Sequence, residues 1–150
     1  MSEKLSVLNK TSAKLPRIPF SLLKNEILGK NYSLSVAFVQ EKESQAINKK
    51  YRQKNKPTNI LSFNLSKTEG EIILCPTVIK KEAKNFSKTF PQFLGFLVIH
   101  GMLHLKGMEH SSTMEQVEEK YDQKYFCRHR RGVVHDTSRG RRVSQRRKKS

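Results

Sequence analysis

The sequence predicts an α+β fold in which a small mixed β-sheet packs with helices around one buried, histidine-bearing helix. Segments with strand alternation are interleaved with segments of helical spacing in the order β-α-β-α-β-β-α-α-α. Residues 93–106 are apolar on nearly every side, which is typical of a central helix that is covered all round. The chain has 150 residues, of which 35% are hydrophobic, enough for one core and not comfortably for two.

The first half of the chain predicts two strands that alternate with two helices. Residues 4–8 favour a first strand. Residues 16–28 have apolar side chains at helical spacing, and the glycine that follows favours a helix end there. Apolar and small residues alternate over 34–38, as in a strand. Helical spacing returns from residue 41 to about residue 55, before a proline that no helix would cross.

The second half predicts two strands and then three helices. Residues 60–65 and 71–75 favour strands joined by a turn at 67–70, for which a hairpin is the simplest connection. Residues 78–86 and the apolar segment 93–106 favour helices. A last helix is expected over 112–126, because its first four residues, Ser-Thr-Met-Glu, have capping-box spacing.

The net charge of +17 points to a polyanionic partner, because 30 Lys and Arg residues face only 13 acidic ones. Residues 128–150 hold ten of the basic residues and one acidic residue, a charge of +9, and their only aliphatic side chains are three valines. Such a segment buries too little apolar surface to offset the entropy of ordering. We therefore expect one domain over residues 1–127 and a basic, disordered tail over 128–150 that contacts a polyanion or merely aids solubility.

Cysteine content and hydropathy predict a cytoplasmic protein without a membrane segment. Cys75 and Cys127 are the two cysteines, too few for a disulfide scaffold or a cysteine-rich zinc knuckle. The longest apolar run, 93–99, is far shorter than the roughly 20 residues of a membrane-spanning helix. The N-terminal residues lack the apolar centre of a signal peptide.

Three histidines in the segment HGMLHLKGMEH predict a metal site. His100 and His104 are four residues apart and therefore lie on one face of a helix. Gly107 is placed to end that helix, so that the chain turns and brings His110 as a third ligand. Three nitrogen ligands leave a fourth position open, as in catalytic zinc sites. The alternative is buried histidines satisfied by backbone carbonyls, which three histidines at this spacing disfavour. His129 and His135 are expected to be bystanders.

Gly101 argues against a peptidase. Metzincin proteases share this histidine spacing but place a glutamate general base directly after the first histidine, where this chain has glycine. Bound Zn²⁺ alone lowers the pKa of its water to about 7, which can suffice to generate hydroxide at neutral pH. An anionic phosphodiester substrate suits the basic chain better than a peptide.

Together with other segments, the histidine motif resembles the YbeY family of bacterial endoribonucleases. Residues 48–52, NKKYR, and 57–63, PTNILSF, are similar to the family elements N-x2-YR and PT-[DN]-VLSF. Gly70-Glu71-Ile72 followed by Cys75-Pro76 is similar to its GDI-x-I-x-P strand. The resemblance extends from about residue 31 to residue 126. The tail departs from it, because family members usually end soon after the last helix.

The resemblance implies one Zn²⁺ per chain, held by His100, His104 and His110, and a role for Arg52 at the active site. It also implies single-stranded RNA as substrate, particularly the 3′ end of the small-subunit rRNA, with the ribosome or a preribosomal particle as partner. From the residues alone, Arg52 is one of several basic side chains on its helix, although a guanidinium is well suited to hold phosphate bidentately. Glu109 is the nearest carboxylate that could orient a group or act as a base.

The leading hypothesis is a metal-dependent endoribonuclease of rRNA maturation and ribosome quality control. The attacking group is open between water at the metal and the 2′-OH of the RNA itself. Two rival hypotheses are a non-catalytic preribosomal RNA-binding assembly factor with a structural zinc, and a metallopeptidase-like hydrolase.

Overall fold

The structure is a computed structural model that describes residues 4–109 and 111–126. Within them, strands and helices follow one another in the predicted order. The elements are β1 (Leu5–Asn9), α1 (Phe20–Ile27), β2 (Ser33–Phe38), α2 (Glu41–Arg52), β3 (Ile60–Ser66), β4 (Glu69–Leu74), α3 (Pro76–Asn85), α4 (Phe90–Lys106) and α5 (Ser112–Phe126). The predicted α+β class is confirmed, and the predicted tail lies outside the described residues.

The four strands form one mixed sheet in the order β1-β2-β4-β3. β1 pairs with β2 and β2 with β4 in parallel, whereas β3 pairs with β4 as an antiparallel hairpin. The hairpin turn is tighter than predicted, because β4 already begins at Glu69, and a register shift lies between Asn64 and Ser66. One side of β3 is therefore an edge of the sheet.

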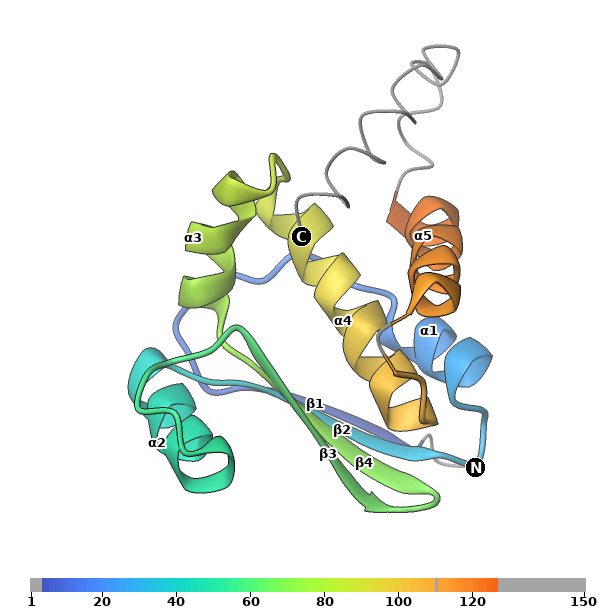
Figure 1. The fold of residues 1–150 in the computed structure, drawn as a ribbon, viewed down its shortest axis with the longest axis horizontal. Coiled ribbons are helices and arrows are strands. Elements are labelled where there is room, and N and C mark those ends of the chain that lie inside the picture. The colour runs from blue at the N-terminus through green and yellow to red at the C-terminus, as the bar shows by residue number, and fades with distance from the viewer. Residues whose placement is uncertain (1–3, 110, 127–150) are drawn as a thin grey trace.

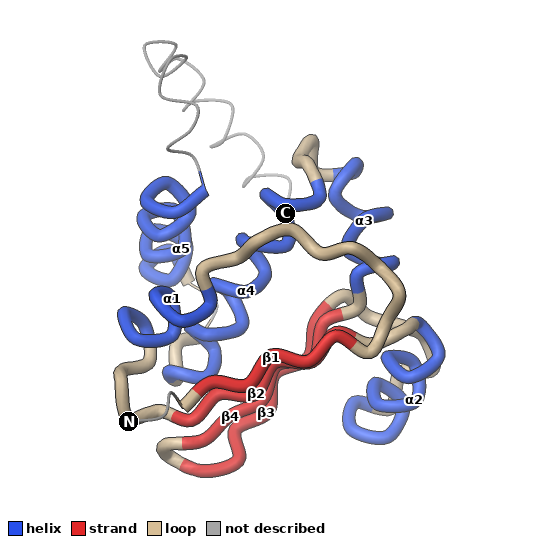
Figure 2. Tube along the Cα trace, turned by 180° about the vertical axis from the view of Figure 1, so that it is seen from behind, coloured by secondary structure: helices blue, strands red, loops and turns tan. Residues whose placement is uncertain are grey.

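Helices cover both faces of the sheet unequally. α4 crosses one face, with α1, α3 and α5 packed around it, and α2 lies on the other face (Figures 1 and 2). Val36 and Ile72 belong to the large core beneath α4, whereas Leu61 and Ile73 belong to a smaller core on the α2 side. Strand alternation explains this division, because neighbouring residues of a strand point to opposite faces.

α4 is the buried central helix that its composition predicts. Ten of its 17 residues are buried. Gly101 lets the helix approach the sheet closely, since a Cβ there would lie 2.9 Å from the Cδ1 atom of Ile60 and 3.3 Å from the Oγ atom of Ser62. Gly107 ends the helix with a left-handed φ of 106°, as predicted.

Two predicted helix boundaries are wrong for reasons of local backbone chemistry. α1 begins at Phe20 rather than at residue 16, because Pro19 disfavours helical backbone in the residue before it. α2 ends at Arg52 rather than near residue 55, because Gln53 adopts a left-handed φ of 58°.

The cap of α5 is also shifted from the prediction. The Ser111 hydroxyl, not that of Ser112, accepts a hydrogen bond from the Met114 amide at 3.2 Å. Cys75 is buried and free, and the described segments contain no helix long and apolar enough to cross a membrane.

Candidate metal centre

His100 and His104 project from the same face of α4 and bring two ring nitrogens together. Their Nε2 atoms are 3.1 Å apart, and the ring planes are nearly perpendicular, with centroids 4.5 Å apart. Two nitrogens bound about 2.0–2.1 Å from a tetrahedral zinc lie roughly 3.3–3.4 Å from each other. The pair therefore fits a zinc ion with little adjustment of either ring.

The second nitrogen of His100 has a carboxylate partner on another helix. Its Nδ1 atom contacts the Oε2 atom of Glu118 on α5. Glu118 is only 5% exposed. Sequence reasoning missed Glu118 because its neighbours in the sequence do not distinguish it from the other acidic residues of α5. Its position was the available signal, since it lies four residues after buried Met114 on the packed side of α5.

Aromatic and apolar groups surround the histidine pair. The Phe96 ring, one turn earlier on α4, stacks with the His100 ring at a centroid distance of 6.0 Å. On the sheet side, α4 packs against β3 and β4 at Gly101. The His100 side chain is 20% exposed, so the site is largely covered but open on one side.

His110, the predicted third ligand, is outside the described residues. Across the ranges that the structure describes, no three His, Cys, Asp or Glu side chains gather as a metal-binding group. The third ligand stays a prediction, with Gly107 placed to turn the chain three residues before it. Glu109 is exposed, and its suggested role also stays a prediction.

Arg52 is the last residue of α2 and is exposed. Since α2 and α4 cover opposite faces of the sheet, Arg52 and the histidine pair come from different layers (Figure 1). Beside Arg52, the Tyr51 ring packs edge-on against Phe63 of β3, at a centroid distance of 5.1 Å. The catalytic role of Arg52 stays a prediction.

Buried polar side chains of α2 hold the segment that leads into β3. The Ser44 hydroxyl lies 2.9 Å from both the amide and the carbonyl of Thr58. Asn48 donates to the Lys56 carbonyl at 2.9 Å, and Asn59 donates to Glu82 at 2.8 Å. These contacts fix the connection that follows Arg52, which is a structural role for the polar residues of this segment.

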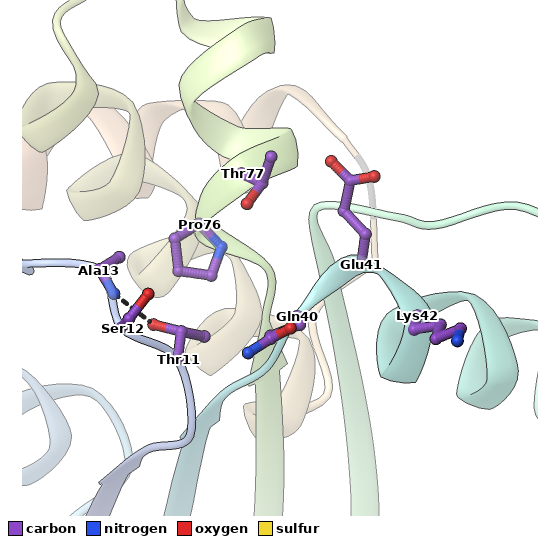
Figure 3. A pocket seen from close by; sticks show the side chains of 8 residues that line it. All are labelled: Thr11, Ser12, Ala13, Gln40, Glu41, Lys42, Pro76 and Thr77. Atoms are coloured by element: carbon purple, nitrogen blue, oxygen red, sulfur yellow. Dashed lines mark hydrogen bonds between the residues drawn. The ribbon is translucent and has the colours of Figure 1, made fainter.

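A separate hollow of about 360 Å³ lies at the carboxyl ends of the parallel strands (Figure 3). The loop after β1 and the first residues of α2 and α3 line it. His100, His104 and Arg52 are not among the described residues that line it.

Comparisons with known proteins identify the family of this chain. The family model described as Endoribonuclease YbeY matches residues 2–129. The chain belongs to the YbeY endoribonuclease family. Endoribonuclease YbeY of Staphylococcus carnosus is 38% identical over 107 residues, which cover 63% of this chain and 70% of that protein. Endoribonuclease YbeY of Staphylococcus aureus strain Newman is 37% identical over 109 residues, with the same two coverages.

A solved structure has a similar fold. The solution structure of TM1509 from Thermotoga maritima has a TM-score of 0.60 to this chain at 27% identity. The match covers 87% of this chain and 95% of that one. The predicted family, fold class and enzyme class, a nuclease that hydrolyses RNA phosphodiester bonds, are confirmed.

Proposed function

We propose that this YbeY family member is a metal-dependent endoribonuclease that cleaves single-stranded RNA in rRNA maturation, including processing of the small-subunit 3′ end, and in ribosome quality control. The observation that carries the metal dependence is the pair of imidazole Nε2 atoms 3.1 Å apart on α4. The net charge of +17 favours RNA as the substrate, and we propose the ribosome or a preribosomal particle as its partner.

His100 and His104 would hold one Zn²⁺, with His110 as the third ligand. A bound Zn²⁺ would supply Lewis-acid stabilisation of the charge that develops on the scissile phosphate. The histidines fit this ion because their Nε2 atoms face each other on α4, a helix that packs against the sheet and against α5. A rigid support of this kind keeps the ligands in place when substrate binds.

Arg52 would bind a phosphate group of the RNA. Its planar guanidinium donates two parallel hydrogen bonds to phosphate oxygens, which a lysine cannot reproduce. Lys49 and Lys50 on the same turn are exposed and add positive charge. β3 is an edge strand of the sheet that separates α2 from α4. For Arg52 and the histidine pair to act on one substrate, the RNA strand would have to pass around an edge of this sheet.

The deciding experiment is cleavage of a single-stranded RNA before chelation, after chelation and after zinc is restored, with circular dichroism recorded in parallel. We expect chelation to stop cleavage while the fold persists, and zinc to restore it. His104→Ala protein, purified identically, is the control for contaminating ribonuclease. Cleavage that survives complete metal removal would refute metal dependence. Stoichiometric zinc without any cleavage would instead favour the assembly-factor hypothesis.

The products separate the two routes of attack. Internal attack by the 2′-OH leaves a 2′,3′-cyclic phosphate, whereas attack by water leaves a 5′-phosphate and a 3′-hydroxyl. Mass spectrometry of the cleaved RNA distinguishes these ends.

A further inference from the structure

Glu118 is a buried carboxylate in a protein whose other described acidic side chains are at least partly exposed. Within residues 4–109 and 111–126 it is the one acidic residue in the buried set, and its side chain is 7% exposed. Removing a carboxylate from water is strongly unfavourable unless a hydrogen-bonding partner compensates for it. A structure that accepts this cost places Glu118 against a specific partner.

That partner is the Nδ1 atom of His100, while the Nε2 atom of the same ring faces His104. A histidine that binds a cation through Nε2 carries its remaining ring proton on Nδ1 and can donate only from there. Glu118 offers the acceptor for that proton. The carboxylate therefore fixes both the direction of the ring and the nitrogen that is left for a metal.

The position of Glu118 is set by the docking of α5. Met114 is 1% exposed, and the Phe126 ring lies so close to α4 that a Cβ on Gly95 would come within 2.6 Å of it. Near the end of α5, Lys124 donates to Glu26 of α1 at 2.6 Å, and this hydrogen bond lowers the pKa of Glu26. Contacts at both ends of α5 thus hold the carboxylate that lies between them.

We propose that Glu118 is a positioning residue of the metal centre, which holds His100 through Nδ1 so that Nε2 points to the ion shared with His104. This inference rests on the proposed metal-dependent function. It also assigns a role to α5, because the helix delivers a group that acts on the site through a histidine.

The test is zinc affinity, measured by competition with a chromophoric chelator, in Glu118→Ala and Glu118→Gln. We expect roughly 10- to 100-fold weaker binding for Glu118→Ala. Glu118→Gln should lose less, because its amide oxygen still accepts the Nδ1 proton but carries no charge. Gln116→Ala, an exposed change on the same helix, is the control and should bind as the wild type does.

A second arm separates positioning from folding. Metal-free Glu118→Gln should retain the wild-type circular dichroism spectrum, so that its weaker binding is not a loss of structure. In the imidazole ¹⁵N–¹H NMR spectrum of the metal-free wild type, the ring proton of His100 should lie on Nδ1, and Glu118→Ala should lose that preference. A His100 ring that keeps its proton on Nδ1 in Glu118→Ala would overturn the inference.

Two other results have distinct meanings. Wild-type zinc affinity in Glu118→Gln, and in Glu118→Ala if that variant folds, would overturn the positioning role and leave the proposed function intact. Wild-type protein that binds no zinc would overturn the metal centre itself and this inference with it.

Discussion

Two buried charged side chains, Lys24 and Glu118, have different roles in this protein. Lys24, near the end of α1, is 1% exposed, and its ammonium donates to three backbone carbonyls, those of Gly29, Lys30 and Tyr32, at 3.0, 3.1 and 2.8 Å. These carbonyls belong to the turn between α1 and β2. The three N–H donors of the Lys24 ammonium thereby each bind a backbone acceptor of this turn.

Glu118 is buried to a similar degree, but its partner is a side chain with a second functional atom. Beyond the His100 ring lies the Nε2 atom that faces His104. Lys24 therefore stabilises a turn, whereas Glu118 orients a histidine ring of the candidate metal centre. The role of a buried charge therefore depends on what its partner does. The partners of Lys24 are backbone carbonyls of a turn, whereas the partner of Glu118 is a histidine whose other nitrogen faces His104.

His104→Ala gives the largest expected effect and tests the functional side of this comparison. It removes one of the proposed ligands and should abolish stoichiometric zinc binding while the fold persists. Elemental analysis and circular dichroism of the purified variant measure both properties. His129→Ala, which changes a histidine outside the motif, should keep a full equivalent of zinc. Full zinc occupancy in His104→Ala would refute the histidine site.

Arg52→Ala extends the comparison to an exposed charge. Because Arg52 is exposed on α2, its removal should leave zinc content and thermal stability unchanged. Cleavage should fall by about 10²-fold or more, the usual effect of losing one group that stabilises developing charge. Arg52→Lys should recover only part of the rate, since a point charge lacks the bidentate fork. Single-turnover cleavage of RNA measures this, and a wild-type rate would remove Arg52 from the mechanism.

Lys24→Met tests the structural side. Methionine fills a similar volume but donates no hydrogen bond, so three carbonyls lose their shared donor and the free energy of unfolding should fall by about 2–4 kcal/mol. Urea denaturation measures the change. Zinc affinity of the folded variant should stay at the wild-type value. A variant that keeps its stability but loses zinc would reverse the assignment of the two buried charges.

The order of strands and helices was predictable because the spacing of apolar residues in each segment reflects which of its faces is buried. The alternation at Leu34, Val36 and Phe38 became β2, with all three residues buried. The continuous apolar run of α4 likewise predicted a covered helix. Boundaries failed where one residue sets the backbone, as at Pro19 and at Gln53.

The sequence predicted only the part of the site that lies on a single helix. His100 and His104 share a helix, so four residues of separation suffice to bring their rings together. Glu118 reaches His100 across 18 residues and a helix–helix packing contact, which no local period encodes. Arg52 shows the same limit, because its distance from the histidines depends on two layers separated by the sheet.

The smallest expected effect concerns residues 128–150, whose +9 charge accompanies little that could pack. If this segment contacts RNA, each neutralised phosphate releases counterions, and the logarithm of affinity falls with the logarithm of salt by about 0.7 per contact for single strands. A chain that stops after Cys127 should bind RNA more weakly at low salt and with a shallower salt dependence. Its zinc content, thermal transition and cleavage at saturating RNA should match the full chain, because the segment lies outside the histidine motif.

The loss of affinity should be similar for RNAs of different sequence, since phosphate contacts position a protein on RNA without specifying the sequence. Salt titrations of binding for the two chains measure the slopes, and identical slopes would show that the segment does not touch RNA and so contributes solubility or a protein contact instead.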